Sequence, residues 1–297
     1  MIYTVTCSPA IDYMIYLDAL AQGEINRSKR ETYHFGGKGI NVSTMLGRLG
    51  VKNTAMGFVG GFTGKALEEG LWKAGMDTDF VHLEEGITRI NIKIKTEQET
   101  EINTQGAPIS REKLNELFDK LDALKEGDVL VVSGSTPNTM PEETYETMLA
   151  RLDGRGIRLI IDAPGPILKK LLKYRPFAIK PNKRELEELM GSKIRTDKAL
   201  AESAGVLQKM GAQNVLISLG ADGAYLLSEE GISYRMEASK VEVVNTVGAG
   251  DSMVAGFLAG YLKTRDYRFA LRLGLAAGSA TACSEGLADP EDIEKFL

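Results

Sequence analysis

Apolar and polar positions along the chain predict strands and helices that alternate. Short apolar runs typical of buried strands lie at 1–6, 53–59, 129–133, 158–162, 176–179, 215–218, 224–227 and 232–236. Apolar residues at helical spacing predict helices at about 64–74, 110–124, 141–153, 165–172, 183–190, 197–210, 251–263 and 267–284. Strands that alternate with helices favour a mostly parallel sheet flanked by helices on both faces, so we predict the α/β fold class.

A second alternating pattern predicts a small sheet apart from the main one. Two runs, at 88–95 and 99–104, flank a short polar turn and carry polar residues at every other position. Such alternation indicates a sheet with one wet face. We predict one domain over 1–297 with a discontinuous β lid made of roughly 11–35 and 87–105. Because a small sheet needs its apolar face covered, we expect a homodimer through the lid, or else a monomer whose lid folds onto its own core.

The composition excludes several classes of function. The 297 residues carry a formal net charge of -5 and no basic stripe, which argues against nucleic acid as a partner. The two cysteines, Cys7 and Cys283, stand apart from any metal-ligand spacing. The N-terminus lacks a basic region and a long apolar core, and no apolar run reaches membrane-spanning length. We therefore expect a cytoplasmic protein with no membrane partner.

The candidate chemistry centres on one stretch, Asn245-Thr246-Val247-Gly248-Ala249-Gly250-Asp251-Ser252. The alternating run at 241–244 predicts a short strand before it, and we expect a helix to begin at about Asp251. A helix N-terminus exposes unpaired N–H groups and partial positive charge, and small residues let a phosphate approach them. A carboxylate at that place would accept the proton of an incoming hydroxyl. The plain alternative is a tight turn in which Asp251 caps the helix.

Further polar residues fall where the predicted strands end. Ligands of parallel sheets bind at the carboxyl ends of the strands, and the residues there are Ser133, Asp162, Lys180-Pro181-Asn182 and Ser218-Leu219-Gly220. A second glycine motif, Gly36-Gly37-Lys38-Gly39-Ile40-Asn41, opens a helix early in the chain. The sequence G-x-x-x-x-G-K-[ST] does not occur, which excludes a P-loop, and the glycines at 57–64 do not fit the dinucleotide-binding spacing G-x-G-x-x-G.

Four ordered elements together resemble the ribokinase-like carbohydrate kinases, in the phosphofructokinase-B branch. The two glycine motifs resemble the N-terminal and C-terminal signatures of that family. Between them, residues 180–185 resemble its Asn-x-x-Glu element, and 218–223 resemble its nucleotide loop. The resemblance covers essentially the whole chain. It implies a ribokinase-like fold with a small β lid, ATP as co-substrate with Mg²⁺, and a sugar phosphate as the acceptor.

The resemblance also implies roles for individual residues. Asp251 would be the catalytic base, beside an anion pocket formed by Gly248, Ala249 and Gly250. The residues that would contact ATP are Asn182, Glu185, Ser218, Gly220, Ala221, Gly223, Gly248 and Gly250, and Glu185 would hold Mg²⁺ through water. The residues that would contact the sugar phosphate are Asp12, Gly36, Gly37, Lys38, Asn41, Arg89, Asn103 and Ser133. We expect Lys38 and Arg89 to grip its phosphate, with Arg27 and Lys29 as alternatives.

Within the branch, the lid runs 88–93 and 100–103 most resemble those of bacterial 1-phosphofructokinases. Those enzymes phosphorylate fructose 1-phosphate at C6 and give fructose 1,6-bisphosphate. The fructose-6-phosphate enzyme of the branch carries an arginine where Glu101 aligns, which argues against that substrate. Tagatose-6-phosphate kinase is the alternative inside the class. A non-catalytic sugar-phosphate-binding regulator is the alternative outside it, and an intact Asp251 argues against this reading because binding alone needs no base.

Overall fold

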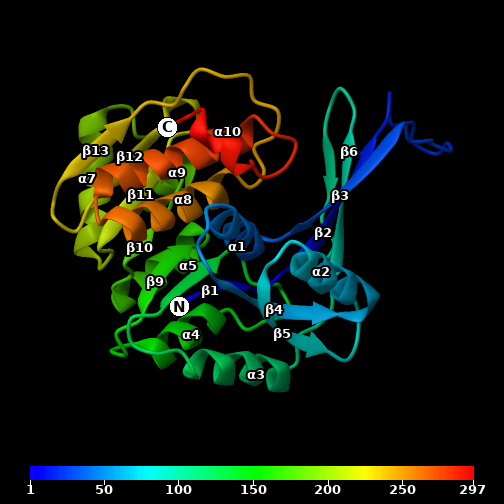
Figure 1. Ribbon diagram of the computed structural model, residues 1–297, viewed down its shortest axis with the longest axis horizontal. Helices are drawn as coiled ribbons and strands as arrows, with labels where there is room; N and C mark the ends of the chain where they lie inside the picture. The colour runs from blue at the N-terminus through cyan, green and yellow to red at the C-terminus, as the bar shows by residue number, and fades with distance from the viewer.

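The computed structural model describes residues 1–297 and contains a large nine-stranded sheet (Figure 1). The strands follow the order β13-β12-β11-β10-β9-β8-β1-β4-β5, and all neighbours are parallel except the antiparallel pairs that β12 makes with β11 and β13. The strands are β1 Ile2–Thr6, β4 Thr54–Gly60, β5 Asp77–Leu83, β8 Val129–Ser133, β9 Arg158–Asp162, β10 Ala178–Ile179, β11 Asn214–Ser218, β12 Ala224–Leu227 and β13 Ser233–Met236. The predicted α/β fold class is confirmed.

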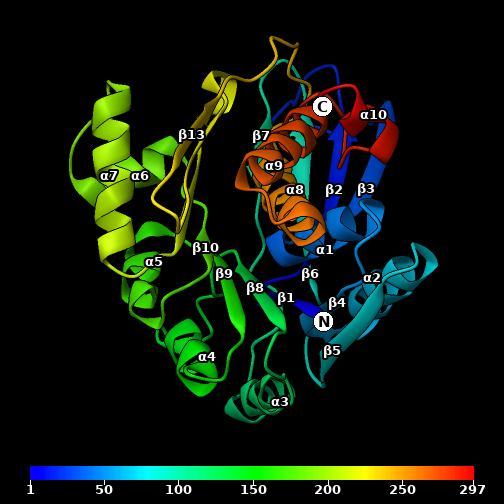
Figure 2. The ribbon, with the colours of Figure 1, turned by 60° about the vertical axis from the view of Figure 1, so that its left-hand side comes forward.

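Helices cover both faces of this sheet, as the turned view in Figure 2 shows. One layer consists of α3 Arg111–Asp122, α4 Thr144–Leu152, α5 Gly165–Leu171, α6 Lys183–Met190 and α7 Asp197–Lys209. The other consists of α1 Lys38–Arg48, α8 Ala249–Thr264, α9 Tyr267–Ala282 and α10 Pro290–Glu294. Outside these layers lie α2 Gly61–Lys73, against β4 and β5, and two short 3₁₀ helices, η1 Leu172–Tyr174 and η2 Gly220–Asp222. No helix combines the length and the apolar character that a membrane crossing requires.

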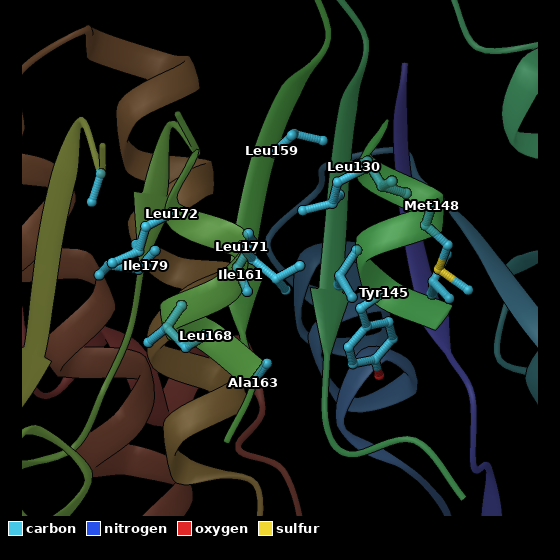
Figure 3. Packing of buried hydrophobic residues seen from close by; sticks show 14 of the residues in the cluster. Leu130, Tyr145, Met148, Leu159, Ile161, Ala163, Leu168, Leu171, Leu172 and Ile179 are labelled. Atoms are coloured by element: carbon cyan, nitrogen blue, oxygen red, sulfur yellow. The ribbon is translucent and has the colours of Figure 1, made fainter. Parts of the chain in front are cut away.

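Each helical layer has its own apolar core. In the first, Tyr145 and Met148 of α4 and Leu168 of α5 point at Leu130 and Ile161 of the sheet (Figure 3). All five side chains are almost completely buried. Burying each such side chain is worth about 1.5–3 kcal/mol relative to leaving it exposed. These two cores hold the sheet between its helices and fix the positions of the loops at its strand ends.

The strand order reverses between β1 and β8. From β1 the chain builds β4 and β5 on one side, and from β8 it builds β9, β10 and β11 on the other. At such a point the loops that leave neighbouring strands diverge, which opens a crevice above the carboxyl ends of the strands. Thr6, Ser133 and Asp162 are the last residues of β1, β8 and β9 and line up at this edge.

The second sheet has four strands and stands away from the main body (Figure 1). In the order β3-β2-β6-β7, its strands are β3 Arg30–Gly36, β2 Ala10–Tyr16, β6 Arg89–Lys95 and β7 Thr100–Ile102. The register aligns one apolar row across all four strands: Tyr33, Tyr13, Ile92 and Ile102. Because side chains alternate between faces, the neighbouring row lies on the other face and is mostly polar: Thr32, Met14, Lys93 and Glu101. The small sheet is therefore present where alternation predicted it.

Three elements differ from the predicted pattern. Residues 241–244 form no strand, and the side chains of Val241, Val243 and Val244 are at least 41% exposed. Strand β5 was not predicted, because it begins with the polar run Asp77-Thr78-Asp79. The five-residue α10 is too short to give a periodic signal.

Candidate functional site

The turn before α8 has the geometry of an anion pocket. Gly248 precedes the helix with φ 81°, a left-handed conformation that favours glycine. The first hydrogen bond across the turn runs from the Ser252 N–H to the Gly248 carbonyl at 2.8 Å, and the Ala249 N–H bonds to the Thr246 carbonyl at 3.3 Å. The N–H groups of Gly250 and Asp251 lie between these two bonds and make no backbone hydrogen bond. They are therefore free for an anionic ligand, whereas the Ala249 N–H has a partner in the chain.

Asp251 lies in the first turn of α8 and is not the helix cap, since Gly248 occupies that position. Its carboxylate is buried and accepts a hydrogen bond from Asn41 Nδ2 on α1, with 2.8 Å between Nδ2 and Oδ2. Burial and the nearby carboxylate of Asp162 raise the pKa of Asp251 to about 6. A carboxylate with such a pKa is ionised at neutral pH and still basic enough to accept a proton. Asn41, which we expect to bind a sugar hydroxyl, thus also orients this carboxylate.

A second buried charge cluster lies beside Asp251. The carboxylate of Asp162 forms ion pairs with Lys38 and Lys180, and each Nζ lies 3.4 Å from a carboxylate oxygen. Lys180 is buried, and its amine would lie 3.2 Å from a Cβ built on Gly250. Burial lowers the pKa of Lys38, but the carboxylates of Asp162 and Asp251 outweigh this effect and hold the pKa above its ordinary value. Lys180 therefore lies beside the open N–H groups of the turn, and Lys38 shares its carboxylate partner, so both ammonium groups are placed to meet a phosphate bound there.

Sequence reasoning gave no role to Lys180 or Asp162, although it placed both at strand ends. Their position at strand ends is the signal that could have found them. Because β9 and β10 are neighbouring parallel strands, the residues at their carboxyl ends lie close together. Lys38, which we expect at the phosphate of the sugar, forms an ion pair with Asp162.

On the opposite side of the site, the backbone of Gly36 and Gly37 passes close to neighbouring residues. Gly37 has φ 113°, and a Cβ there would lie 2.6 Å from Thr6 Cγ2 and 3.1 Å from Pro9 Cα. A Cβ on Gly36 would collide with the carboxylate of Asp12. Asp12 in turn accepts a hydrogen bond from Asn91 Nδ2 at 2.8 Å. The hydroxyl of Ser133 is buried at the end of β8 and has no hydrogen-bond partner. These groups form a polar surface between the small sheet and α1.

A cavity of about 190 Å³ extends from this surface. Asp12, Gly36 and Asn41 line one end, and His34 and Lys93 of the small sheet line its wall together with Arg48 of α1. The guanidinium of Arg48 is held by the carbonyls of Leu287 and Ala288 and by the Asp289 carboxylate. An ion pair of 2.9 Å between Arg30 and Glu285 joins β3 to the loop after α9. The same loop is tied to the catalytic turn, because Asn245 Nδ2 donates to the Glu285 carbonyl at 2.9 Å.

Four of the expected basic or polar contacts do not point into this cavity. Arg89 donates from Nη2 to the Ser8 carbonyl at 3.1 Å, and its Nε is buried without a partner. Asn103 lies exposed after the end of β7. Arg27 is exposed, and Lys29 is exposed and paired with Asp18. The structure thus places these residues around the small sheet, at its base, its edge and the loop before β3.

A second pocket, of about 470 Å³, lies on the other side of the catalytic turn. Most of the expected nucleotide contacts line it: Asn182, Ser218, Gly220, Ala221, Gly223 and Gly250. Val241 and Val243 also line it, so their exposed side chains face an apolar hollow suited to a flat base. Gly250 lines this pocket, and Asn41, which bonds to the neighbouring Asp251, lines the sugar-side cavity.

Asn182 and Glu185 form a capping box at the start of α6. The Asn182 side chain accepts from the Glu185 N–H at 2.9 Å, and Glu185 Oε2 accepts from the Asn182 N–H at 2.8 Å. The pair therefore fixes the end of the nucleotide pocket. The second carboxylate oxygen of Glu185 has no hydrogen-bond partner in the chain, and oxygen ligands and ordered water are what Mg²⁺ prefers, so this position fits the expected metal.

The pKa of Asp251 gives a prediction for the pH dependence of turnover. Only the ionised carboxylate accepts a proton, so we expect kcat/KM to rise with pH through about 6 and to be level above it. The hydrogen bond from Asn41 lowers the pKa of Asp251, so Asn41→Ala should move this midpoint to higher pH. Initial rates between about pH 5 and 8 would measure the shift.

Thr44→Ala is the matched control, because Thr44 lies one turn along the same face of α1 and bonds to the Ile40 carbonyl instead. An equal displacement of the midpoint in both variants would contradict the assignment of the rise in kcat/KM to ionisation of Asp251.

The comparisons with known proteins agree with this geometry. The model of the pfkB family carbohydrate kinases matches residues 6–294. A 1-phosphofructokinase of Bacillus subtilis is 42% identical over 297 residues, covering 100% of this chain and 97% of that protein. A D-tagatose-1-phosphate kinase of Bacillus licheniformis is 40% identical over 300 residues, covering 99% and 97%. The solved structure of phosphofructokinase-2 from Escherichia coli in complex with substrates and products is 28% identical with a TM-score of 0.93, covering 99% of this chain and 97% of that one. The chain belongs to the pfkB family of carbohydrate kinases.

Proposed function

We propose that this kinase transfers the γ-phosphoryl group of ATP to the C6 hydroxyl of fructose 1-phosphate. The observation that carries the proposal is the buried carboxylate of Asp251, which has a pKa of about 6. It bonds to Asn41, which lines one pocket, and adjoins Gly250, which lines the other. One pocket has the apolar hollow and glycine loop that suit a nucleotide, and the other has the polar wall that suits a sugar. A binding protein would gain nothing from such a buried base.

In the proposed step, the sugar hydroxyl donates its proton to the Asp251 carboxylate while its oxygen bonds to the γ-phosphorus. The bond from that phosphorus to the β–γ bridging oxygen breaks, and ADP leaves with the electron pair. Negative charge on the transferring group is held by the N–H groups of Gly250 and Asp251 and by the ammonium groups of Lys38 and Lys180. Mg²⁺ would neutralise the leaving phosphates when bound, held through water by Glu185.

The identity of the sugar phosphate is the finer part of the proposal. The relatives include a 1-phosphofructokinase at 42% identity and a D-tagatose-1-phosphate kinase at 40%. Fructose and tagatose differ only in the configuration at C4, so their 1-phosphates would present the same phosphate and the same C6 hydroxyl. We favour fructose 1-phosphate and keep tagatose 1-phosphate as the second candidate, beside tagatose 6-phosphate.

The test is release of ADP by purified protein with ATP and Mg²⁺. The acceptors are fructose 1-phosphate, tagatose 1-phosphate, tagatose 6-phosphate, fructose 6-phosphate and fructose. We expect the highest kcat/KM with fructose 1-phosphate. A preference for either tagatose phosphate would replace the substrate but keep the chemistry. Absence of turnover with all five would contradict the kinase proposal and favour a regulator.

We further propose that two copies pair through the apolar face of the small sheet, which then serves as a lid. The row formed by Tyr33, Tyr13, Ile92 and Ile102 crosses all four strands, and Tyr33 and Ile102 are 59% and 49% exposed. Packing this apolar face against a second copy would remove it from water, which is favourable. Tyr33→Asp should therefore give a monomer, whereas wild type should be a dimer at micromolar concentration by analytical ultracentrifugation.

The control is Tyr16→Asp, at the outer end of β2, where the ring packs under Arg30. A wild-type monomer would contradict the pairing, and a dimer that survives Tyr33→Asp would exclude this face.

A further inference from the structure

The small sheet places one buried cation inside the sugar-side cavity. Lys93 lies in the middle of β6, and its side chain is only 8% exposed. It lines the same cavity as Asp12 and Asn41. Lysine is almost never buried without a partner, and here the partner is Glu101, whose carboxylate lies 3.1 Å from Lys93 Nζ on the neighbouring strand β7.

Glu101 satisfies only part of the ammonium group. A lysine ammonium has three N–H donors, and Glu101 is its only protein partner. Glu101 itself is 41% exposed, so it approaches from the outer edge of the sheet and leaves the cavity side of the ammonium open. Two buried oxygens on the same polar face of the sheet also lack partners, Asn91 Oδ1 and Thr32 Oγ1. Neither of them lines the cavity, so it is the ammonium that points to a ligand there: buried N–H donors without a full set of partners indicate that a ligand completes them.

The register of the sheet fixes where this cation lies relative to the sugar. Asp12 and Asn91 form one row of the polar face, and Met14 and Lys93 form the next row outward. Two residues along a strand advance about 6.6 Å. Asn41 lines the same cavity as Asp12 and bonds to Asp251. The order Asp251, Asp12, Lys93 therefore matches a hexose with its reacting hydroxyl at one end and an anionic group at the other.

The other basic groups near this cavity have different partners. Lys38 pairs with Asp162 at the catalytic turn, and Arg48 is held by two carbonyls and Asp289. Arg89 turns to the Ser8 carbonyl and does not line the cavity.

We propose that Lys93 binds the phosphate of the sugar-phosphate substrate. This contact makes the enzyme prefer a phosphorylated sugar over a free one, and the ion pair with Glu101 holds the Lys93 side chain in place. This inference rests on the proposed function. It adds to that proposal a residue which selects the anionic end of the acceptor.

The test compares fructose 1-phosphate with free fructose in the same enzyme. In Lys93→Met, kcat/KM for fructose 1-phosphate should fall about 10- to 100-fold, the value of one or two hydrogen bonds to a charged group. The value for fructose should change little, and KM for ATP should be unchanged. Lys93→Arg keeps the charge and should recover most of the preference. A loss of equal size for both sugars would overturn the proposal, because it would mean that Lys93 supports the sheet alone.

Two further variants separate the competing explanations. Glu101→Gln removes the carboxylate but keeps the amide shape, and the preference for the phosphorylated sugar should be kept or increased. A collapse as large as that of Lys93→Met would assign the ion pair to folding and overturn the proposal. Arg89→Ala should lower the preference less than Lys93→Met does. The reverse order would assign the phosphate to Arg89 and also overturn it.

A binding measurement distinguishes failure of this inference from failure of the proposed function. If wild type turns over none of the sugars, the proposed function has failed, but Lys93 can still be tested by thermal shift with inorganic phosphate and with fructose 1-phosphate. We expect both to stabilise wild type more than Lys93→Met. Equal shifts in the two proteins would overturn the role of Lys93 whatever the reaction is.

Discussion

Asp251→Asn should fold normally and lose about three orders of magnitude or more in kcat. The amide has the same shape as the carboxylate and can still accept the hydrogen bond from Asn41, but it cannot accept the proton of the sugar hydroxyl. Because the buried carboxylate carries a charge that burial disfavours, removal of that charge should leave the melting temperature equal or higher. Steady-state kinetics and thermal melting measure the two effects in one preparation.

Asp266→Asn is the matched control for this substitution. Asp266 caps the neighbouring helix α9 by accepting from the Phe269 N–H at 2.9 Å, and asparagine is an equally good cap. It should therefore change neither kcat nor stability. Near-normal turnover by folded Asp251→Asn would remove the base from the mechanism, and a decrease of the same size in both variants would point to a general effect of the substitution.

Gly250→Val should lower kcat about 10²- to 10³-fold, the usual effect of losing one donor of an anion hole. A Cβ at this position would lie 3.2 Å from Lys180 Nζ, and a branched side chain would also cover the free N–H groups of the turn. Valine is not a worse helix former than glycine, so the helix itself should form. Stopped-time assays with saturating ATP and sugar phosphate would isolate kcat from binding.

Gly205→Val is the control for this second variant. Gly205 lies inside α7 and a Cβ there meets nothing within 4 Å, so the added side chain enters open space. Full activity of Gly205→Val together with a large loss in Gly250→Val would locate the effect at the turn. Full activity of Gly250→Val would show that phosphoryl transfer does not use this approach.

The fold could be predicted because most of its elements repeat a strong local pattern. Strands such as Val129–Ser133 are buried on both faces and are therefore apolar up to the polar residue at their carboxyl end. The run at 241–244 was misread for a physical reason: its valines are apolar because they line the second pocket, and no strand of the sheet lies beside them. Apolar residues that line a ligand pocket give the same local signal as apolar residues of a strand that packs in a sheet.

The candidate site could be predicted where it depends on short motifs and not where it depends on packing. The glycine turn at 248–251 indicates an anion pocket once the other motifs of the chain are read with it. The residues of the capping box between Asn182 and Glu185 give a pattern that fits a surface pair equally well. The pairing of Lys180 with Asp162, and of Lys93 with Glu101, depends on which strands are neighbours. That information is long-range, and local spacing carries none of it.

The small sheet is assembled from segments far apart in the sequence, and this has a consequence for biosynthesis. Asp12 and Asn91 are 79 residues apart, yet they are paired across β2 and β6. A nascent chain that has not yet delivered Arg89–Lys95 from the ribosome holds only the β2–β3 hairpin, which is marginal alone and leaves Tyr13 and Tyr33 uncovered. Such exposed apolar surface favours aggregation during translation. The hairpin therefore stays uncovered while α1, β4, α2 and β5 are made between β3 and β6.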